Sequence, residues 1–163
     1  MEHKTFQDSK KSGFTLIELL ITIAILTTLA VIGGVNLFSY SSRQSLTSAA
    51  DEIVAILRQA QTSSISQESG DQWGVHFLNA TTTQGLIQLF HGSSFAAGTL
   101  VNSQVLPSGV QFINPVSGTS TDVIFSKVTG YPNASASIKL ALIIDSNTSS
   151  TITISAIGKV SRF

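Results

Sequence analysis

The feature that most constrains this chain is an apolar run from Phe14 to Val35 that contains one charged residue, Glu18. The run holds no Lys, Arg, Asp or Pro. As an α-helix its roughly 22 residues would rise about 33 Å, enough to cross the hydrocarbon core of a bilayer. A carboxylate in such a helix costs roughly 2.5–3.5 kcal/mol near the bilayer centre and less near an end. The sequence therefore predicts a membrane-crossing helix in which something compensates for Glu18.

The leader before this run, residues 1–13, is polar and includes Lys10 and Lys11 directly before the apolar segment. Lysines in this place hold their flank in the cytoplasm, so we expect the C-terminal part on the extracytoplasmic side. An ordinary secretory signal has a shorter apolar region with a small-residue cleavage site after it. Here the small residue Gly13 lies before the run, and Gly33-Gly34 is the nearest candidate after it.

Lys10–Gly13, followed by Phe-Thr-Leu-Ile-Glu-Leu-Leu from Phe14 to Leu20, resembles the processing and assembly segment of type IV pilins and type II secretion pseudopilins. The resemblance implies that a prepilin peptidase cuts between Gly13 and Phe14 and that the new amino group of Phe14 is N-methylated. It also implies that the partners are sister pilin or pseudopilin subunits, an assembly platform protein and the membrane.

A physical reason for Glu18 can be given beside this resemblance. After cleavage, Phe14 would carry an ammonium group, and positions four apart lie on one face of a helix. Between helices, the amine of one subunit can meet the Glu18 carboxylate of its neighbour and set the axial register. A buried ion pair specifies register better than it adds net stability. The alternative is a carboxylate that reaches the headgroups in a plain single-span anchor.

The composition fits one extracytoplasmic domain behind an anchor. Removing the leader from 163 residues leaves 163 − 13 = 150, the size of one ordinary domain. Nine basic and nine acidic residues cancel, and charged residues are 11% of the chain, against a usual quarter. A net charge of zero at this low density of charged residues provides no broad basic surface that would attract nucleic acid. The absence of cysteine excludes disulfides and thiolate metal sites; we expect no cofactor and no metal.

After Gly33-Gly34 the helical pattern continues. Apolar residues recur at intervals of three and four at Leu46, Ala49, Ala50, Ile53, Ile56, Leu57 and Ala60. Without a proline between Phe14 and Glu68, we predict one helix of about 50 residues, roughly 75–80 Å long. Gly33 and Gly34 each cost roughly 1 kcal/mol relative to Ala. They are a site of helix flexibility or, equally, of close helix–helix approach through small residues.

From Trp73 on, the pattern has a period of two, with turn residues between short apolar runs. The predicted strands are Trp73–Leu78, Leu86–His91, Leu100–Leu106, Val110–Ile113, Val123–Lys127, Ile138–Ile144 and Thr151–Ile157. Strands at this close spacing predict an antiparallel sheet or sandwich packed on the helix. The last two should form a hairpin across the turn at 145–150.

The sequence contains no catalytic motif of the H-E-x-x-H, G-x-S-x-G or phosphate-loop type. His76 and His91 lie in predicted strands, and we interpret both as surface or half-buried residues of the sheet. The segment Asp145-Ser146-Asn147 could offer oxygen ligands to Ca²⁺, but a hairpin turn is the simpler interpretation. We therefore expect no enzyme.

The helix end at 56–61, the first strand and the C-terminal segment are similar, in order and pattern, to H-type minor pseudopilins and to related DNA-uptake minor pilins. In the DNA-uptake proteins a glycine precedes clustered basic residues near the C-terminus. Here Gly158 precedes Lys159 and Arg162, a partial match. Two basic side chains contribute modestly to phosphate binding, and a solvated strand end is the preferred interpretation, so we do not expect nucleic acid as a partner.

Together these arguments predict an α+β pilin fold, in which a long N-terminal helix, transmembrane in its first half, packs against a β-rich head. The predicted parts are a cleaved leader (1–13), a transmembrane and assembly helix (14–38), an amphipathic helix (39–68) and the head (69–163). We expect a single-pass protein of the bacterial inner membrane that later enters a periplasmic or surface filament. The expected function is that of a minor pilin or pseudopilin of type II secretion; a DNA-uptake or adhesion pilin, or a single-span anchored binding domain, are the alternatives.

Overall fold

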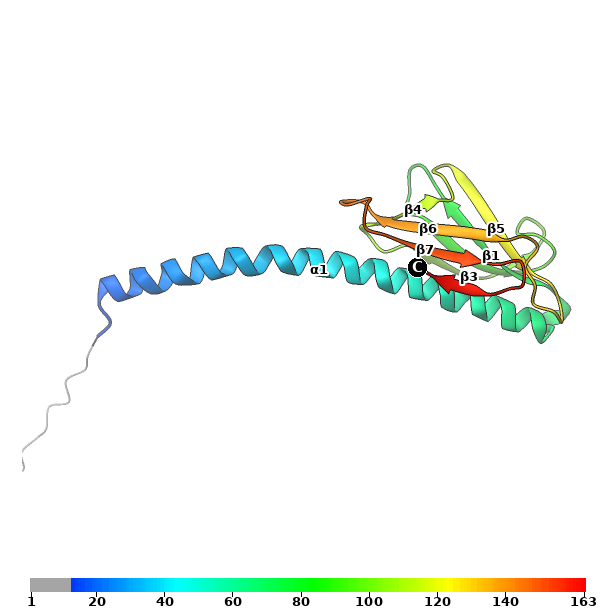
Figure 1. Ribbon diagram of the computed structural model, residues 1–163, viewed down its shortest axis with the longest axis horizontal. Helices are drawn as coiled ribbons and strands as arrows, with labels where there is room; N and C mark the ends of the chain where they lie inside the picture. The colour runs from blue at the N-terminus through cyan, green and yellow to red at the C-terminus, as the bar shows by residue number, and fades with distance from the viewer. Residues whose placement is uncertain (1–12) are drawn as a thin grey trace, which may run out of the picture. The chain divides into compact units, whose positions relative to one another are not determined.

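The computed structural model describes residues 13–163, with the side chains of 31–39 excepted. The chain divides into two compact units between Ser39 and Tyr40. Helix α1 (Leu16–Ile65) has 50 residues, which confirms the predicted single helix, and a short 3₁₀ turn at Glu68–Gly70 follows it (Figure 1).

Two antiparallel sheets of four strands each make up the rest of the second unit. The first has the strand order β3-β2-β1-β5 and the second the order β4-β6-β7-β8. The bounds are β1 (Trp73–Asn79), β2 (Leu86–His91), β3 (Thr99–Val105), β4 (Val110–Asn114), β5 (Thr119–Phe125), β6 (Ala136–Leu142), β7 (Ser149–Ile154) and β8 (Val160–Arg162). The α+β fold class is thereby confirmed.

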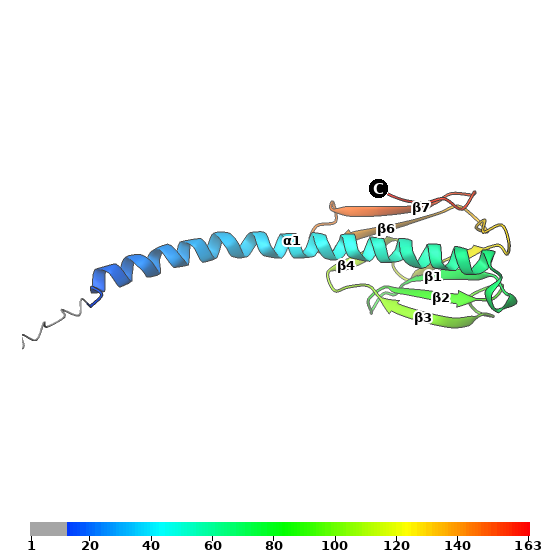
Figure 2. The ribbon, with the colours of Figure 1, turned by 90° about the horizontal axis from the view of Figure 1, so that it is seen from below.

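One hydrophobic core joins the helix to both sheets. All seven apolar positions predicted for the second half of α1 are buried, because a stripe at intervals of three and four faces one side of a helix. Val75 and Phe77 of β1, Leu140 of β6 and Ile152 of β7 pack in the same cluster. Figure 2 shows this part of α1 crossing both sheets, with β1, β2 and β3 on one side and β6 and β7 on the other.

The predicted strands differ from the observed ones mainly at their ends. The hairpin of β6 and β7 is confirmed, but β6 ends at Leu142, so that Ile143 and Ile144 lie beyond it. β5 begins at Thr119 inside a predicted turn, because its polar first half pairs by backbone with β1. The prediction also missed β8, a strand of three residues that pairs with β7.

A second, smaller apolar cluster covers the outer face of the first sheet. Phe95, from the loop between β2 and β3, stacks on the His76 ring at 3.9 Å between centroids and meets Phe90 edge-on at 5.4 Å. His76 is also bonded to Asp122, its cross-strand partner on β5. It is 8% exposed, so the prediction of a surface or half-buried residue was wrong for His76. It was right for His91, which is half-buried and bonded to Asp71 at 3.1 Å.

Candidate processing and assembly segment

The start of α1 is built by a threonine cap. Thr15 precedes the first helical residue, and its hydroxyl accepts a hydrogen bond from the backbone N–H of Glu18 at 3.3 Å. The carbonyl of Thr15 accepts the N–H of Leu19 at 3.2 Å. Thr-x-x-Glu is the sequence pattern of a capping box. The sequence reasoning missed Thr15, although this pattern could have identified it.

The cap places the Gly13–Phe14 bond just before the helix. Both residues are exposed and non-helical, and a Cβ built on Gly13 would find no atom within 4 Å. Among the described residues, nothing packs on this bond. Cleavage would leave an ammonium group on Phe14 near the helix N-terminus, where the macrodipole disfavours positive charge. The carboxylate of Glu18 lies in the first turn, where it offsets the dipole and would also offset that ammonium.

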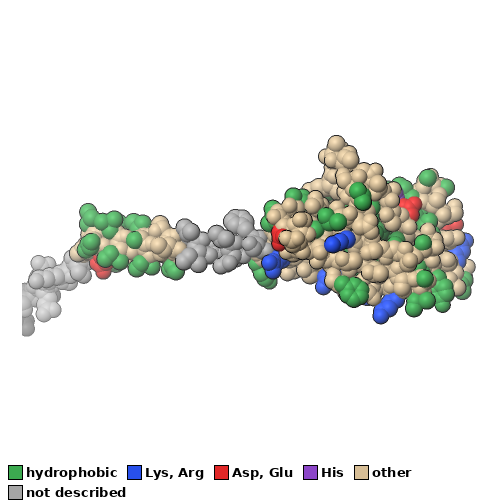
Figure 3. Space-filling model, turned by 45° about the horizontal axis from the view of Figure 1, so that its top comes forward, with side chains coloured by type: hydrophobic (Ala, Val, Ile, Leu, Met, Phe, Trp, Pro, Cys, Tyr) green, Lys and Arg blue, Asp and Glu red, His purple; other side chains and the backbone are tan. Residues whose placement is uncertain are grey.

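The described part of this segment presents apolar side chains to all sides. Phe14 is 81% exposed, Leu16 78% and Leu26 65%, and the other large apolar residues up to Leu29 are at least half exposed. Figure 3 shows these hydrophobic side chains around the N-terminal stretch of α1. An apolar surface of this extent marks an interaction with membrane or protein.

The threonines of the segment bond to their own helix. The hydroxyls of Thr22, Thr27 and Thr28 each donate to a backbone carbonyl three or four residues earlier, at 2.8–3.0 Å. A hydroxyl that is bonded in this way can enter apolar surroundings without losing a partner. These three polar residues are therefore compatible with the apolar character of the helix.

Other predicted features of the N-terminal unit lie outside the described residues. These are the leader with Lys10 and Lys11, and the surroundings of Gly33 and Gly34 in α1. Over the residues that are described, no helix combines the length and apolarity needed to span a membrane.

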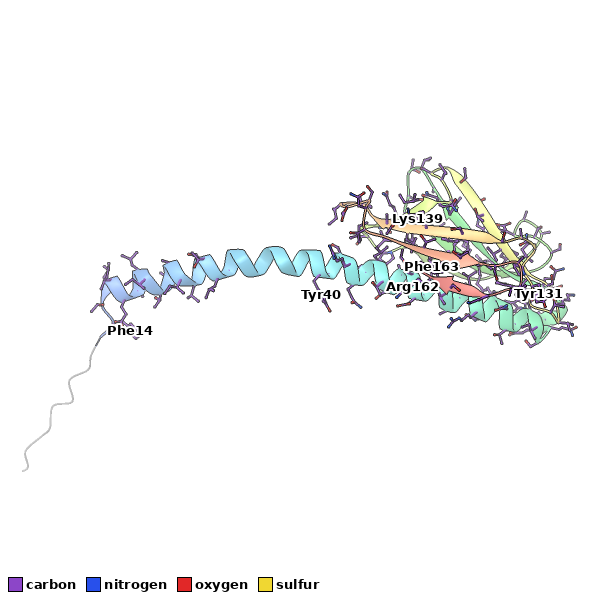
Figure 4. All side chains as sticks on the ribbon, viewed as in Figure 1. Phe14, Tyr40, Tyr131, Lys139, Arg162 and Phe163 are labelled. Atoms are coloured by element: carbon purple, nitrogen blue, oxygen red, sulfur yellow. The ribbon has the colours of Figure 1, made fainter. Side chains whose placement is uncertain are left out.

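The structure separates the two basic residues of the tail. Arg162 of β8 is turned to α1, where its guanidinium pairs with the Asp51 carboxylate at 2.9 Å and donates to the Thr47 carbonyl at 3.2 Å. Lys159 is exposed in the turn between β7 and β8. Figure 4 labels Arg162 beside α1. Asp51 neutralises Arg162, and a DNA contact by Lys159 and Arg162 stays a prediction.

One cavity of the head, with a volume of about 430 Å³, is lined by neutral residues, among them Thr81, Thr83, Gln111 and Phe112. Within the described residues, no group of three or more His, Asp or Glu side chains could hold a metal ion. Asp145 closes the β6–β7 turn: its carboxylate accepts the Thr148 hydroxyl at 2.6 Å and the Asn147 N–H at 3.2 Å. The turn interpretation of this segment is thus confirmed.

Comparison with known proteins agrees with this description. Residues 8–34 match the family model described as the prokaryotic N-terminal methylation motif. No curated protein matches the chain by sequence. The structure is similar to the type IV minor pilin FimU of Pseudomonas aeruginosa, with a TM-score of 0.52 and 14% identity over 72% of this chain and 92% of FimU. It is also similar to the minor pseudopilin EpsH of the type 2 secretion system of Vibrio cholerae, with a TM-score of 0.50 and 11% identity over 73% of this chain and 95% of EpsH.

At these identities the solved structures show the fold alone, while the match to the methylation motif covers a range that contains Gly13, Phe14 and Glu18. Pilins and pseudopilins are structural subunits and not enzymes. The chain is thus similar to type IV pilins and pseudopilins in two respects, its N-terminal methylation motif and its fold.

Proposed function

We propose that this protein is a minor subunit of a pilus-like filament, anchored in the inner membrane by Phe14–Val35 until it is assembled. The observation that carries the proposal is the apolar surface of the first helix turns, which is exposed on all sides and whose one charged residue, Glu18, lies beside a capped helix start. Such a surface has to be covered by lipid before assembly and by the helices of other subunits afterwards.

In this proposal a prepilin peptidase removes residues 1–13 and the Phe14 amine is methylated. An assembly platform protein then helps to transfer the subunit from the bilayer into the filament. There the amine of one subunit meets the Glu18 carboxylate of a neighbour, so that two charges that are unfavourable in an apolar core neutralise each other. The chain performs mechanical work and no catalysis.

The filament we propose is the pseudopilus of a type II secretion system, supported by the likeness to EpsH. A type IV pilus is the second candidate, supported by the likeness to FimU. Deletion of the gene separates the two: loss of protein secretion with normal surface pili supports the pseudopilus. Loss of pili with normal secretion would assign the subunit to a type IV pilus.

The processing step is tested by mass spectrometry of the protein from its native membrane. We expect a mature chain that begins at N-methylated Phe14. A chain that still begins at Met1 would contradict processing and would support a single-span anchored binding domain.

The role of the Glu18 charge is tested by two substitutions that separate charge from capping. Glu18→Gln keeps a side chain that suits a capping box but removes the charge. Thr15→Val removes the capping oxygen, at a typical cost of about 1 kcal/mol in helix stability, and keeps the charge.

If the carboxylate meets an amine, the Glu18→Gln subunit should reach the membrane at normal levels and fail to join filaments. The Thr15→Val subunit should join them. Equal loss of incorporation for both variants, or normal incorporation of Glu18→Gln, would show that the charge has no assembly role.

A further inference from the structure

The connection between β6 and β7 begins with two exposed isoleucines. Beyond the end of β6, Ile143 is 59% exposed and Ile144 is 77% exposed. The backbone is held in place, because the Ile143 N–H donates to the Gly109 carbonyl at 2.9 Å and the Asp145 carboxylate closes the turn. We call Ile143 and Ile144 the hairpin tip. It presents an apolar surface from an ordered turn.

The hairpin tip lies at the end of the head where the chain continues to the N-terminal unit. The pKa of Asp145 is lowered, first by the Thr148 hydroxyl and, among further causes, by the positive charge of Arg43 on α1. This places the carboxylate within the electrostatic range of the first head-side residues of the helix. Figure 4, drawn in the view of Figure 1, labels Tyr40, and the loop that follows β6 reaches about as far along α1 as this residue.

The chemistry of this end suits the surface of a membrane. Tyr40 is 70% exposed, and tyrosine is enriched at membrane interfaces, where its ring can lie among apolar groups and its hydroxyl in water. Five helical residues from Val35, the end of the apolar run, to Tyr40 rise about 7.5 Å. The interfacial layer outside the hydrocarbon core is roughly 5–7 Å thick on each side, so Tyr40 would lie at its outer edge.

The charges beside the hairpin tip cancel. Arg43 is basic, Asp145 is acidic, and Tyr40 and the two isoleucines are neutral. An end of this kind needs no anionic lipid, since its attraction to the surface comes from apolar side chains.

We propose that the hairpin tip and Tyr40 are a membrane contact of the head, resting in the interfacial layer of a zwitterionic bilayer while the subunit waits for assembly. The inference rests on the proposed function, because it requires that Phe14–Val35 anchors the chain. The contact limits how the head can turn above the bilayer before a partner subunit takes it up.

The absence of cysteine from the chain allows a direct test. An environment-sensitive fluorophore is attached to Ile144→Cys in the full-length protein, which is reconstituted into phosphatidylcholine vesicles. The matched control is Ile157→Cys, an isoleucine that is 70% exposed. It lies in the turn before Gly158, at the opposite end of the head beside Gln61. Vesicle flotation and quenching by spin-labelled lipid are measured for both.

We expect both proteins to float with the vesicles. The label at 144 should show emission at shorter wavelength and loss of fluorescence with the quencher lipid, whereas the label at 157 should show neither. The same result is expected with and without anionic lipid.

Three outcomes would overturn the inference in distinguishable ways. Failure to float would remove the anchor, and with it both the proposed function and the membrane contact. Flotation with equal, weak quenching at both positions would remove the contact alone. Protection of the label at 144 that appears only at high protein-to-lipid ratio would show that a second copy of the chain covers the hairpin tip instead.

Discussion

Gln61 ties the end of the helix to two loops that are remote in sequence. Its side-chain amide donates to the carbonyl of Gly130 and to the carbonyl of Gly158, both at 3.0 Å. Both glycines are buried and have positive φ, +65° and +79°. Because one side chain holds both loops, we expect Gln61→Leu to destabilise the head without altering its core.

The size of the effect follows from the two lost hydrogen bonds. At about 0.5–1.5 kcal/mol each, their loss predicts a decrease of about 1–3 kcal/mol in the free energy of unfolding. For a domain of this size that corresponds to a drop in Tm of roughly 4–12 °C. Gln59→Leu, at an exposed position on the same helix, is the control and should stay within about 0.5 kcal/mol of the parent.

The measurement is denaturant and thermal unfolding of residues 40–163, the unit that contains the hydrophobic core. Trp73 serves as the fluorescence reporter, since it is 4% exposed and its indole N–H donates to the Glu68 carbonyl at 2.9 Å. Identical unfolding of the Gln61→Leu and Gln59→Leu proteins would refute the reasoning.

Two further predictions concern the loops of the head. Gly158→Ala should destabilise the head more than Gly109→Ala. Both glycines have positive φ, but a Cβ at position 158 would lie 2.5 Å from Gln61 Nε2, whereas a Cβ at position 109 would meet no atom within 4 Å. Equal Tm values for the two variants would show that the Gly158 site relaxes freely. Thr148→Val should raise the pKa of Asp145 towards its ordinary value of 3.8, because the Thr148 hydroxyl is the main cause of the lowered pKa. A carboxyl whose pKa is lowered in the folded state stabilises the fold at pH values above its ordinary pKa, and this stability is lost as the pH falls through the folded-state pKa. The variant should therefore lose less stability on acidification than the parent. Carboxyl NMR titration and unfolding between pH 5 and 2 measure both effects, and an unchanged titration of Asp145 would contradict the prediction.

Local patterns were enough to predict the helix and most strands. The buried face of α1 was predicted residue by residue, since a 3.6-residue period needs no knowledge of what packs against it. β2 was predicted at its observed bounds, Leu86–His91, because apolar residues and flanking glycines mark it in the sequence. The prediction for the segment around Phe14 and Glu18 is likewise local, because it depends only on the charge, size and order of residues along one stretch of the chain.

Long-range contacts decided the rest. β8 and the first half of β5 form because the backbone of a neighbouring strand offers hydrogen bonds, and their side chains carry little strand signal. The burial of His76 depends on Phe95, which arrives from another loop. Similarly, the sequence shows Gln61 only as a polar residue of a helix, because the two carbonyls that its amide binds come from distant loops. Interactions between residues that are close in sequence can be predicted from the sequence. Interactions between distant residues, which meet only after the chain has folded back, are visible only in the tertiary structure.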